Sequence, residues 1–259
     1  WYSGYIGYGG GPGVKARDHY GTDLRLRAQL HLEFEDGTEQ VIPTDESWRA
    51  SRGPIQYSDF LQGEKYDARK EIAGWNMPGY DTAWDSVDIT ESVDTHVETY
   101  PTQPVRVFQE IEPVEIAEPE DGVCIFDMGT NFAGFVRLKV KAPAGTEINL
   151  RFGERLWPDG RIYTENMRSA RAIDTYICKG GGVEVWEPKF TFHGFQYVEV
   201  TGLPGKPAKD LITGIELTSD CPVVGSFECN DEMANTLYRN ITQTQRANFI
   251  DIPTDCPQR

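Results

Sequence analysis

The stretch "FVRLKVKAPAGTEINLRF", residues 135–152, decides the fold class of this chain. Its apolar residues fall at every second position on both sides of "APAG", and they are Val136, Leu138, Val140, Ile148, Leu150 and Phe152. Because successive side chains of a strand point to opposite faces, this alternation predicts two strands that each bury one face. The "APAG" between them predicts the turn by which the chain returns.

The same pattern continues on both sides. Residues 24–34, "LRLRAQLHLEF", alternate throughout and predict a long half-buried strand, followed by an Asp36-Gly37 hairpin turn and the returning "EQVIP". Residues 172–186 predict a hairpin around three glycines, and residues 189–202 predict a strand interrupted by a bulge at Gly194. Strands this frequent indicate antiparallel β-sandwiches or jelly rolls.

The period changes after residue 226. Asn230 is the expected N-cap of a helix with acidic residues in its first turn. Its apolar stripe comprises Met233, Ala234, Leu237, Tyr238 and Ile241. The polar, proline-containing stretch 92–105 predicts an earlier boundary. We therefore predict a mainly β chain with two antiparallel sandwich domains, residues 1–98 and 99–225, followed by a helical domain that begins within residues 226–259.

Composition excludes several classes of partner. The 259 residues carry 25 basic and 41 acidic side chains, a net charge of −16. Binding to nucleic acid or to anionic lipid needs a basic surface, so we expect neither partner. No apolar run approaches the length of a transmembrane helix. Neutral polar ligands such as sugars stay open.

The cysteines do not form a recognisable framework. Their number is odd and no CxxC pair occurs, which argues against a disulfide scaffold and against zinc. They are Cys124, Cys178, Cys221, Cys229 and Cys256. We favour buried free thiols, with a Cys221–Cys229 bridge as the alternative. We expect no metal and no cofactor, and the cysteines leave the cellular compartment undecided.

Two internal stretches have residues that catalysis uses. Residues 152–168 combine carboxylates with aromatic rings, as glycosidases do, and the residues concerned are Glu154, Asp159, Glu165, Trp157 and Tyr163. Because "PDG" is also ordinary turn chemistry, we favour a long loop that reaches over a neighbouring domain. For His193 we favour a core or interface histidine over a nucleophilic pair with Cys256.

The two ends of the sequence are also distinctive. The opening "WYSGYIGYGGG", residues 1–11, has aromatic rings that could stack on sugars, although a strand and a tight turn explain it as well. The final "NFIDIPTDCPQR", residues 248–259, is braced by prolines in the manner of a pocket rim. Its Asp255 can accept hydrogen bonds from sugar hydroxyls and its Arg259 can donate several. A capping Asp with a surface Arg is the alternative.

The sequence resembles bacterial α-L-rhamnosidases of glycoside hydrolase family 78. The resemblance is carried by "NFIDIPTDCPQR" and by long stretches before it, and covers essentially the whole chain. Those stretches are "GSFECNDEMANTLYRNI", "FTFHGFQYVEVTGLPG", "RFGERLWPDGRIYTENMR", "FDMGTNFAGFVRLKV" and "PTDESWRASRGPIQYSDFLQGEKYDARKEIAGW".

The resemblance implies an N-terminal sandwich, a concanavalin-like sandwich and an (α/α)6 barrel whose first helix starts near Asn230. It further implies hydrolysis of terminal α-L-rhamnose with inversion, by one carboxylic acid and one carboxylate that activates water. Both carboxylates are expected beyond Arg259, so no catalytic residue is assigned and this chain alone is expected to be inactive. The incomplete first sandwich is likewise expected to have strands before Trp1.

By position, Asp255 and Arg259 match residues that contact rhamnose in the family. The expected partners are therefore rhamnose-containing glycosides or polysaccharides and the helical barrel. Some members of the family bind rhamnose through calcium in an accessory sandwich, but no ligand set of that kind can be matched here. The alternative function is a stand-alone carbohydrate-binding or structural sandwich without catalysis.

Overall fold

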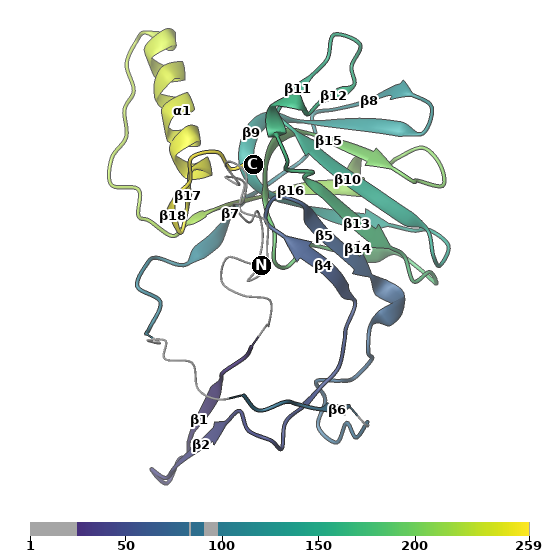
Figure 1. Ribbon diagram of the computed structural model, residues 1–259. Coiled ribbons are helices and arrows are strands. Elements are labelled where there is room, and N and C mark those ends of the chain that lie inside the picture. Colours follow the sequence, from purple (N-terminus) through teal and green to yellow (C-terminus); the bar gives the residue numbers. More distant parts are fainter. Residues whose placement is uncertain (1–24, 83, 91–97, 259) are drawn as a thin grey trace, which may run out of the picture.

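The protein is mainly β with one α-helix near its C-terminal end, as expected (Figure 1). The computed structural model describes residues 25–82, 84–90 and 98–258. The opening stretch 1–11 and Arg259 lie outside these residues. In the described part of the chain, no helix has the length and hydropathy needed to cross a bilayer.

The elements follow one another along the chain in this order. They are β1 (Gln29–Glu33), β2 (Glu39–Pro43), β3 (Arg49–Ala50), β4 (Ile55–Asp59), β5 (Gly63–Asp67), the 3-10 turn Ala68–Lys70, β6 (Asp85–Ser86), β7 (Val105–Ile111), β8 (Glu115–Glu120), β9 (Val123–Val140), β10 (Glu147–Gly153), β11 (Arg155–Leu156), β12 (Ile162–Tyr163), the 3-10 turn Glu165–Met167, β13 (Ile173–Ile177), β14 (Glu184–Trp186), β15 (His193–Thr201), the 3-10 turn Lys209–Leu211, β16 (Ile212–Ser219), α1 (Glu232–Ala247), β17 (Phe249–Ile250) and β18 (Ile252–Pro253).

A curled sheet of ten strands dominates the described residues (Figure 1). Its main path runs β4-β5-β13-β10-β15-β9-β16-β7, and β8 and β14 also pair with β9. The long β9 changes partners along its length: its start pairs with β8 and β15, and its end pairs with β16 and β14. At the crossing with β16 the backbones nearly touch, since a Cβ at Gly134 would lie 1.9 Å from the carbonyl oxygen of Ile215. Glycine is therefore required where the sheet curls.

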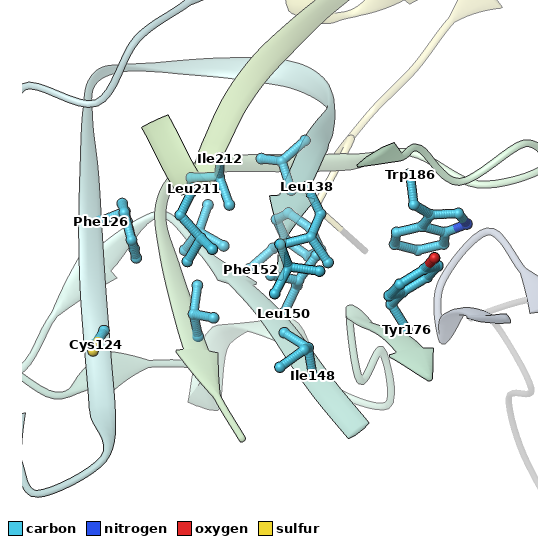
Figure 2. Packing of buried hydrophobic residues seen from close by; sticks show 14 of the residues in the cluster. Cys124, Phe126, Leu138, Ile148, Leu150, Phe152, Tyr176, Trp186, Leu211 and Ile212 are labelled. Carbon is cyan, nitrogen blue, oxygen red and sulfur yellow. The ribbon is translucent and has the colours of Figure 1, made fainter. Parts of the chain in front are cut away.

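The core lies within the curl of this sheet (Figure 2). All six alternating apolar residues of the stretch 135–152 are buried, as predicted. Burial of each such side chain contributes about 1.5–3 kcal/mol relative to leaving it in water. Tyr176 and Trp186 extend the core with ring centroids 5.3 Å apart.

Two predicted hairpin pairings are wrong. β15 lies between β9 and β10, although the chain does turn between them. β13 pairs with β10 and β5, whereas β14 pairs with β9, so residues 172–186 do not form a hairpin. Alternation specifies which face of a strand is buried, but it carries no information about a partner from distant sequence.

The bulge predicted at Gly194 lies further along β15. Gly194 pairs in register with Ala133, and the register shifts between Phe195 and Tyr197. The glycine at position 194 therefore has a cause other than the bulge.

The Asp36-Gly37 hairpin between β1 and β2 is confirmed. The Gly37 amide donates to the carbonyl oxygen of Phe34 at 2.9 Å, and Gly37 has a φ of +80°. The preceding strand is shorter than predicted, and its apolar face is mostly exposed: Leu30 is 54% accessible and Leu32 is partly buried. Periodicity marks an apolar face, but burial also requires a second layer over it, and no described residue buries this one.

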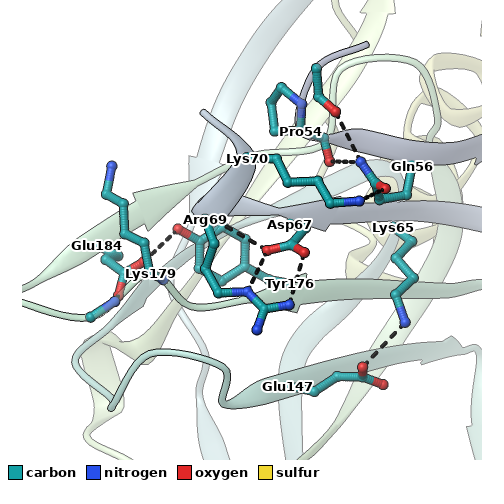
Figure 3. A network of polar contacts seen from close by, with 12 residues as sticks. Pro54, Gln56, Lys65, Asp67, Arg69, Lys70, Glu147, Tyr176, Lys179 and Glu184 are labelled. Carbon is teal, nitrogen blue, oxygen red and sulfur yellow. Dashed lines mark hydrogen bonds and ion pairs between the residues drawn. The ribbon is translucent and has the colours of Figure 1, made fainter. Parts of the chain in front are cut away.

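The strand β5 joins the region before residue 98 to the large sheet, through parallel pairing with β13. Ion pairs flank it: Lys65 lies 3.2 Å from Glu147, and Asp67 lies 2.8 Å from Arg69 (Figure 3). The division at 1–98, 99–225 and 226–259 stays a prediction.

Candidate functional site

The candidate site is the C-terminal loop, defined as residues 248–258, which follows α1. The helix begins one residue later than predicted, because its N-cap is Asp231 and not Asn230. The Asp231 carboxylate accepts a 2.9 Å hydrogen bond from the Met233 amide. Both residue types cap well, so sequence did not distinguish the two positions.

The helix is anchored to the sheet near its C-terminal end by Glu216 of β16. This carboxylate is fully buried and accepts hydrogen bonds from Gln109 at 2.6 Å and from Gln243 of α1 at 2.9 Å. The guanidinium of Arg246 lies 3.5 Å from Glu216 and 4.6 Å from the centre of the Phe108 ring. The buried charge is thus paired and hydrogen-bonded, as a buried carboxylate requires. It fixes where α1 ends and where the C-terminal loop starts.

The predicted apolar stripe of α1 is present: Ala234 and Tyr238 are partly buried, and its other three residues are exposed. Met233, Leu237 and Ile241 are 81%, 59% and 56% accessible. Figure 1 shows the helix standing beside the curled sheet, to which its lower part is joined.

The C-terminal loop begins with a tight hairpin of β17 and β18 around Asp251. Asp251 has a φ of +72°, in the left-handed region that Asp tolerates better than most residues. Its carboxylate accepts hydrogen bonds from the hydroxyls of Thr102 and Tyr100, and these bonds lower its pKa. The Asp251 amide donates to Ser219 of β16 at 2.9 Å. Two separate parts of the chain therefore hold the turn.

The next residue of interest, Asp255, is exposed and accepts a 3.1 Å hydrogen bond from the thiol of Cys256. A carboxylate has about four lone-pair sites, so Asp255 can accept further hydrogen bonds from a ligand. Its predicted partner Arg259 lies outside the described residues. Their joint contact with a sugar stays a prediction.

The end of the loop lies on the sandwich. A Cβ built at Gly194 of β15 would lie 2.8 Å from the Gln258 nitrogen and 3.0 Å from the Pro257 carbonyl carbon. The loop backbone thus rests directly on the strand.

His193 is a core histidine, as favoured from the sequence. It is 2% accessible, its Nε2 lies 3.1 Å from Asp174, and its ring stacks on Phe152 at 4.2 Å. Asp174 also accepts the Glu64 amide at 2.8 Å. Burial is the largest influence on Glu64 and raises the pKa of that carboxyl.

The stretch 152–168 contains a small hairpin, β11–β12, which is held by ring and ion-pair contacts across its turn. Trp157 and Tyr163 meet edge to face at 4.7 Å. Asp159 pairs with Arg161 across the turn at 2.7 Å, which lowers the pKa of the carboxyl. These contacts are those of a stable turn, in agreement with the turn chemistry of "PDG".

Glu154 links this hairpin to the rest of the site, because it accepts hydrogen bonds from Asn131 at 2.8 Å and from Asn166 at 3.3 Å. The Asn131 carbonyl in turn accepts from Gln243 of α1 at 3.2 Å. Whether the hairpin reaches over a neighbouring domain stays a prediction.

No disulfide joins any of the five cysteines in the part of the chain that the structure describes. Cys124 and Cys178 are buried, as expected, and burial raises the pKa of each. Cys221 is exposed, and Cys229 and Cys256 are partly buried, so the expectation of buried thiols is wrong for these three.

Sequence reasoning missed most of the residues that hold the loop. Glu216, Ser219, Thr102 and Tyr100 are unremarkable in sequence, because each matters only through a contact with a residue far along the chain. The one signal for them in the sequence is the interruption of a strand by Gly194, which by itself indicates a bulge.

Comparison with known proteins assigns all regions of the chain to one family. Three family models match: the α-L-rhamnosidase N-terminal domain over residues 1–109, the bacterial α-L-rhamnosidase concanavalin-like domain over 117–218, and the bacterial α-L-rhamnosidase 6 hairpin glycosidase domain over 222–259.

Individual relatives indicate the same family as the three family models. An α-L-rhamnosidase of Streptomyces avermitilis is 47% identical over 265 aligned positions, which cover 100% of this chain and 25% of the relative. The crystal structure of the Streptomyces avermitilis α-L-rhamnosidase complexed with L-rhamnose superposes with a TM-score of 0.92 at 46% identity, covering 100% of this chain and 25% of that one. An α-L-rhamnosidase from Dictyoglomus thermophilum superposes with a TM-score of 0.86 at 39% identity, covering 89% and 26%. The chain therefore spans about a quarter of the length of the relatives it matches.

Proposed function

Because this chain belongs to the bacterial α-L-rhamnosidase family, we propose that it is the accessory region of a glycoside hydrolase that removes terminal α-L-rhamnose from glycosides or polysaccharides. The observation that carries the proposal is the match along the whole chain, with a TM-score of 0.92 to an α-L-rhamnosidase complexed with L-rhamnose. The C-terminal loop lies within the part that matches the 6 hairpin glycosidase domain.

The proposed reaction inverts the anomeric centre. One carboxylic acid protonates the leaving oxygen while a carboxylate on the opposite face of the sugar activates water. Neither group is assigned to this chain. Its role in the reaction is to hold the C-terminal loop and to support the helical barrel.

Asp255 and Arg259 are the proposed sugar contacts. The exposed Asp255 carboxylate accepts hydrogen bonds from sugar hydroxyls, and the Arg259 guanidinium donates them in a planar fork. Loss of a charged partner from such a contact costs about 1.5–3 kcal/mol. Asp255→Asn in the complete enzyme is therefore expected to lower kcat/KM by about tenfold or more.

The exposed residues of the α1 stripe support the proposed contact between this chain and the rest of a helical barrel. Burial of Met233, Leu237 and Ile241 would contribute about 1.5–3 kcal/mol each. We assign this face to barrel helices.

The test is hydrolysis of 4-nitrophenyl α-L-rhamnopyranoside by the full-length protein that carries this chain. We expect nitrophenol release, with β-L-rhamnose as the first anomer in the proton NMR spectrum. An α anomer first would contradict inversion, and no release would contradict the proposed activity. Release by the 259-residue chain alone would show that the catalytic carboxylates lie within it.

Calorimetric titration of the 259-residue chain with L-rhamnose distinguishes the accessory role from the alternative, a stand-alone carbohydrate-binding module. Saturable binding would favour a carbohydrate-binding module that acts without catalysis. Absence of heat, together with activity of the full-length protein, would favour the supporting role.

A further inference from the structure

The contact between Gly194 and the C-terminal loop has a purely steric cause. Gly194 does not adopt a positive φ, so its backbone is open to any L-residue. Yet an added Cβ would meet the Gln258 nitrogen at 2.8 Å and the Gln258 Cα at 3.3 Å. These are backbone atoms, which cannot rotate away as the end of a side chain can. Close approach of two backbones is a known reason for glycine within a strand.

Gly194 is itself well fixed. It pairs with Ala133 of β9, and its neighbours His193 and Phe195 are buried at 2% and 0% accessibility. The Phe195 ring lies 4.4 Å from that of Phe132 in the core. When a methyl group is added at position 194, the loop is therefore the partner that gives way.

The other end of the loop is fixed independently. Asp251 is held by Tyr100, Thr102 and Ser219, and the Thr254 amide donates to the carbonyl oxygen of Asn248 at 2.8 Å. Asp255 lies between this anchored turn and the contact at Gly194. A shift at residues 257–258 consequently changes the position of Asp255.

We infer that Gly194 is a positioning residue: its missing side chain seats the C-terminal loop on β15 and thereby sets the place of Asp255 toward the sugar. The contact of Asp255 with a sugar rests on the proposed function. The sandwich then contributes to sugar recognition because its strand β15 positions a loop of the neighbouring helical region.

Two glycine controls isolate the effect. Gly182 has no heavy atom within 4 Å of an added Cβ and no positive φ, so Gly182→Ala is the neutral control. An added Cβ at Gly214 meets the side chains of Phe132 at 2.7 Å and of Met128 at 2.9 Å. Gly214→Ala therefore disturbs the core through side chains that can shift, and it makes no direct contact with the loop.

The first readout is the alkylation rate of Cys256, resolved by mass spectrometry against the exposed Cys221 in the same molecule. Cys256 is partly buried and lies two residues before Gln258. Displacement of the loop by Gly194→Ala is expected to change the ratio of the two rates by about threefold or more. Gly182→Ala should leave the ratio unchanged. A wild-type ratio in Gly194→Ala overturns the inference, as does an equal change in Gly214→Ala.

The second readout is kcat/KM of the full-length protein on the nitrophenyl rhamnoside, measured well below the melting temperature of each variant. Gly194→Ala should lose about tenfold or more, because misplacement of a contact by an ångström is that costly. Gly214→Ala should lower the melting temperature and keep kcat/KM. If the wild-type enzyme is inactive, both the proposed function and the contact of Asp255 with a sugar are wrong. The alkylation ratio still decides whether Gly194 positions the loop.

Discussion

Asp251 holds the turn of the C-terminal loop, and its charge matters for that role. The hydroxyl of Thr102 is the strongest influence and that of Tyr100 the second, and both lower the pKa of Asp251 from the ordinary value of 3.8. The same bond raises the pKa of Tyr100, so the two shifts agree. A carboxyl whose folded pKa is lowered stabilises the fold above its unfolded pKa, and that contribution disappears as the pH falls through the folded pKa.

We therefore expect protection of the Thr254 amide from hydrogen exchange to fall as the pH drops from about 5 toward 3 in the wild type. Asp251→Asn keeps an acceptor and tolerates the left-handed conformation but has no charge to lose. Its protection should be lower at pH 5 and flat over the same range. A parallel fall in both proteins would show that another group controls the turn.

Asp174 is the second residue with a decisive role, because it is buried and serves two partners. Its removal in Asp174→Ala leaves the Glu64 amide and His193 without an acceptor. Stranded buried groups of this kind cost about 1–3 kcal/mol each. We expect a loss of about 3 kcal/mol in the free energy of unfolding, measured by urea denaturation.

The matched control is Asp210, whose 2.7 Å pair with Lys139 is exposed. Asp210→Ala should change the free energy of unfolding by less than about 1 kcal/mol, since water screens surface pairs. Equal losses in the two variants would mean that burial is not what makes Asp174 important.

At the scale of elements, α1 is a helix held at its two ends by different means. Its start depends on the local cap Asp231, and its end depends on Glu216 of a distant strand. None of its residues is buried in the described structure. Local interactions therefore carry an unusually large share of its stability.

Asp231→Ala is expected to destabilise the start of α1 by about 1 kcal/mol, because the Met233 amide loses its acceptor. Hydrogen exchange of the first turn should quicken about fivefold, the rate change that this free energy implies. Asn230→Ala, at the position predicted from sequence to be the cap, should have almost no effect. The reverse order of the two variants would restore Asn230 as the cap.

At the scale of the whole molecule, β5 is the joint between the region before residue 98 and the large sheet. Gly63 begins this strand with a φ of +103°, and its added Cβ would lie 2.1 Å from the carbonyl oxygen of Ile173. Beyond the backbone pairing, Tyr66 stacks on Tyr176 at 5.8 Å. The Lys65–Glu147 ion pair and the hydrogen bond from the Glu64 amide to Asp174 also cross this joint.

Gly63→Ala is expected to destabilise this joint by about 2–4 kcal/mol, through strain and the backbone clash together. Trypsin should then cut after Lys65 or Lys70 sooner than in the wild type, while the rest of the sheet stays intact. Gly53→Ala is the control, because no heavy atom lies within 4 Å of its added Cβ. Unchanged cleavage in Gly63→Ala would show that the joint tolerates a side chain there.

Sequence determined the features that depend on local periodicity and on local chemistry. The family resemblance follows from longer motifs spread along the chain. The buried faces of β9 and β10, the Asp36-Gly37 hairpin and the apolar stripe of α1 follow from patterns within a few consecutive residues. Each such pattern reports which side of an element is apolar or where a turn is favourable. It reports nothing about the distant segment that will lie beside it.

Only the tertiary structure decided the partners. It placed β15 between β9 and β10, left the face of β1 exposed, and brought Glu216 to α1 and Gly194 to the C-terminal loop. The physical reason is that these contacts join residues more than 25 positions apart, where loop closure permits many partners at nearly equal entropic cost. The choice among them falls to the packing of the whole core and to the buried groups that must find a hydrogen-bond partner.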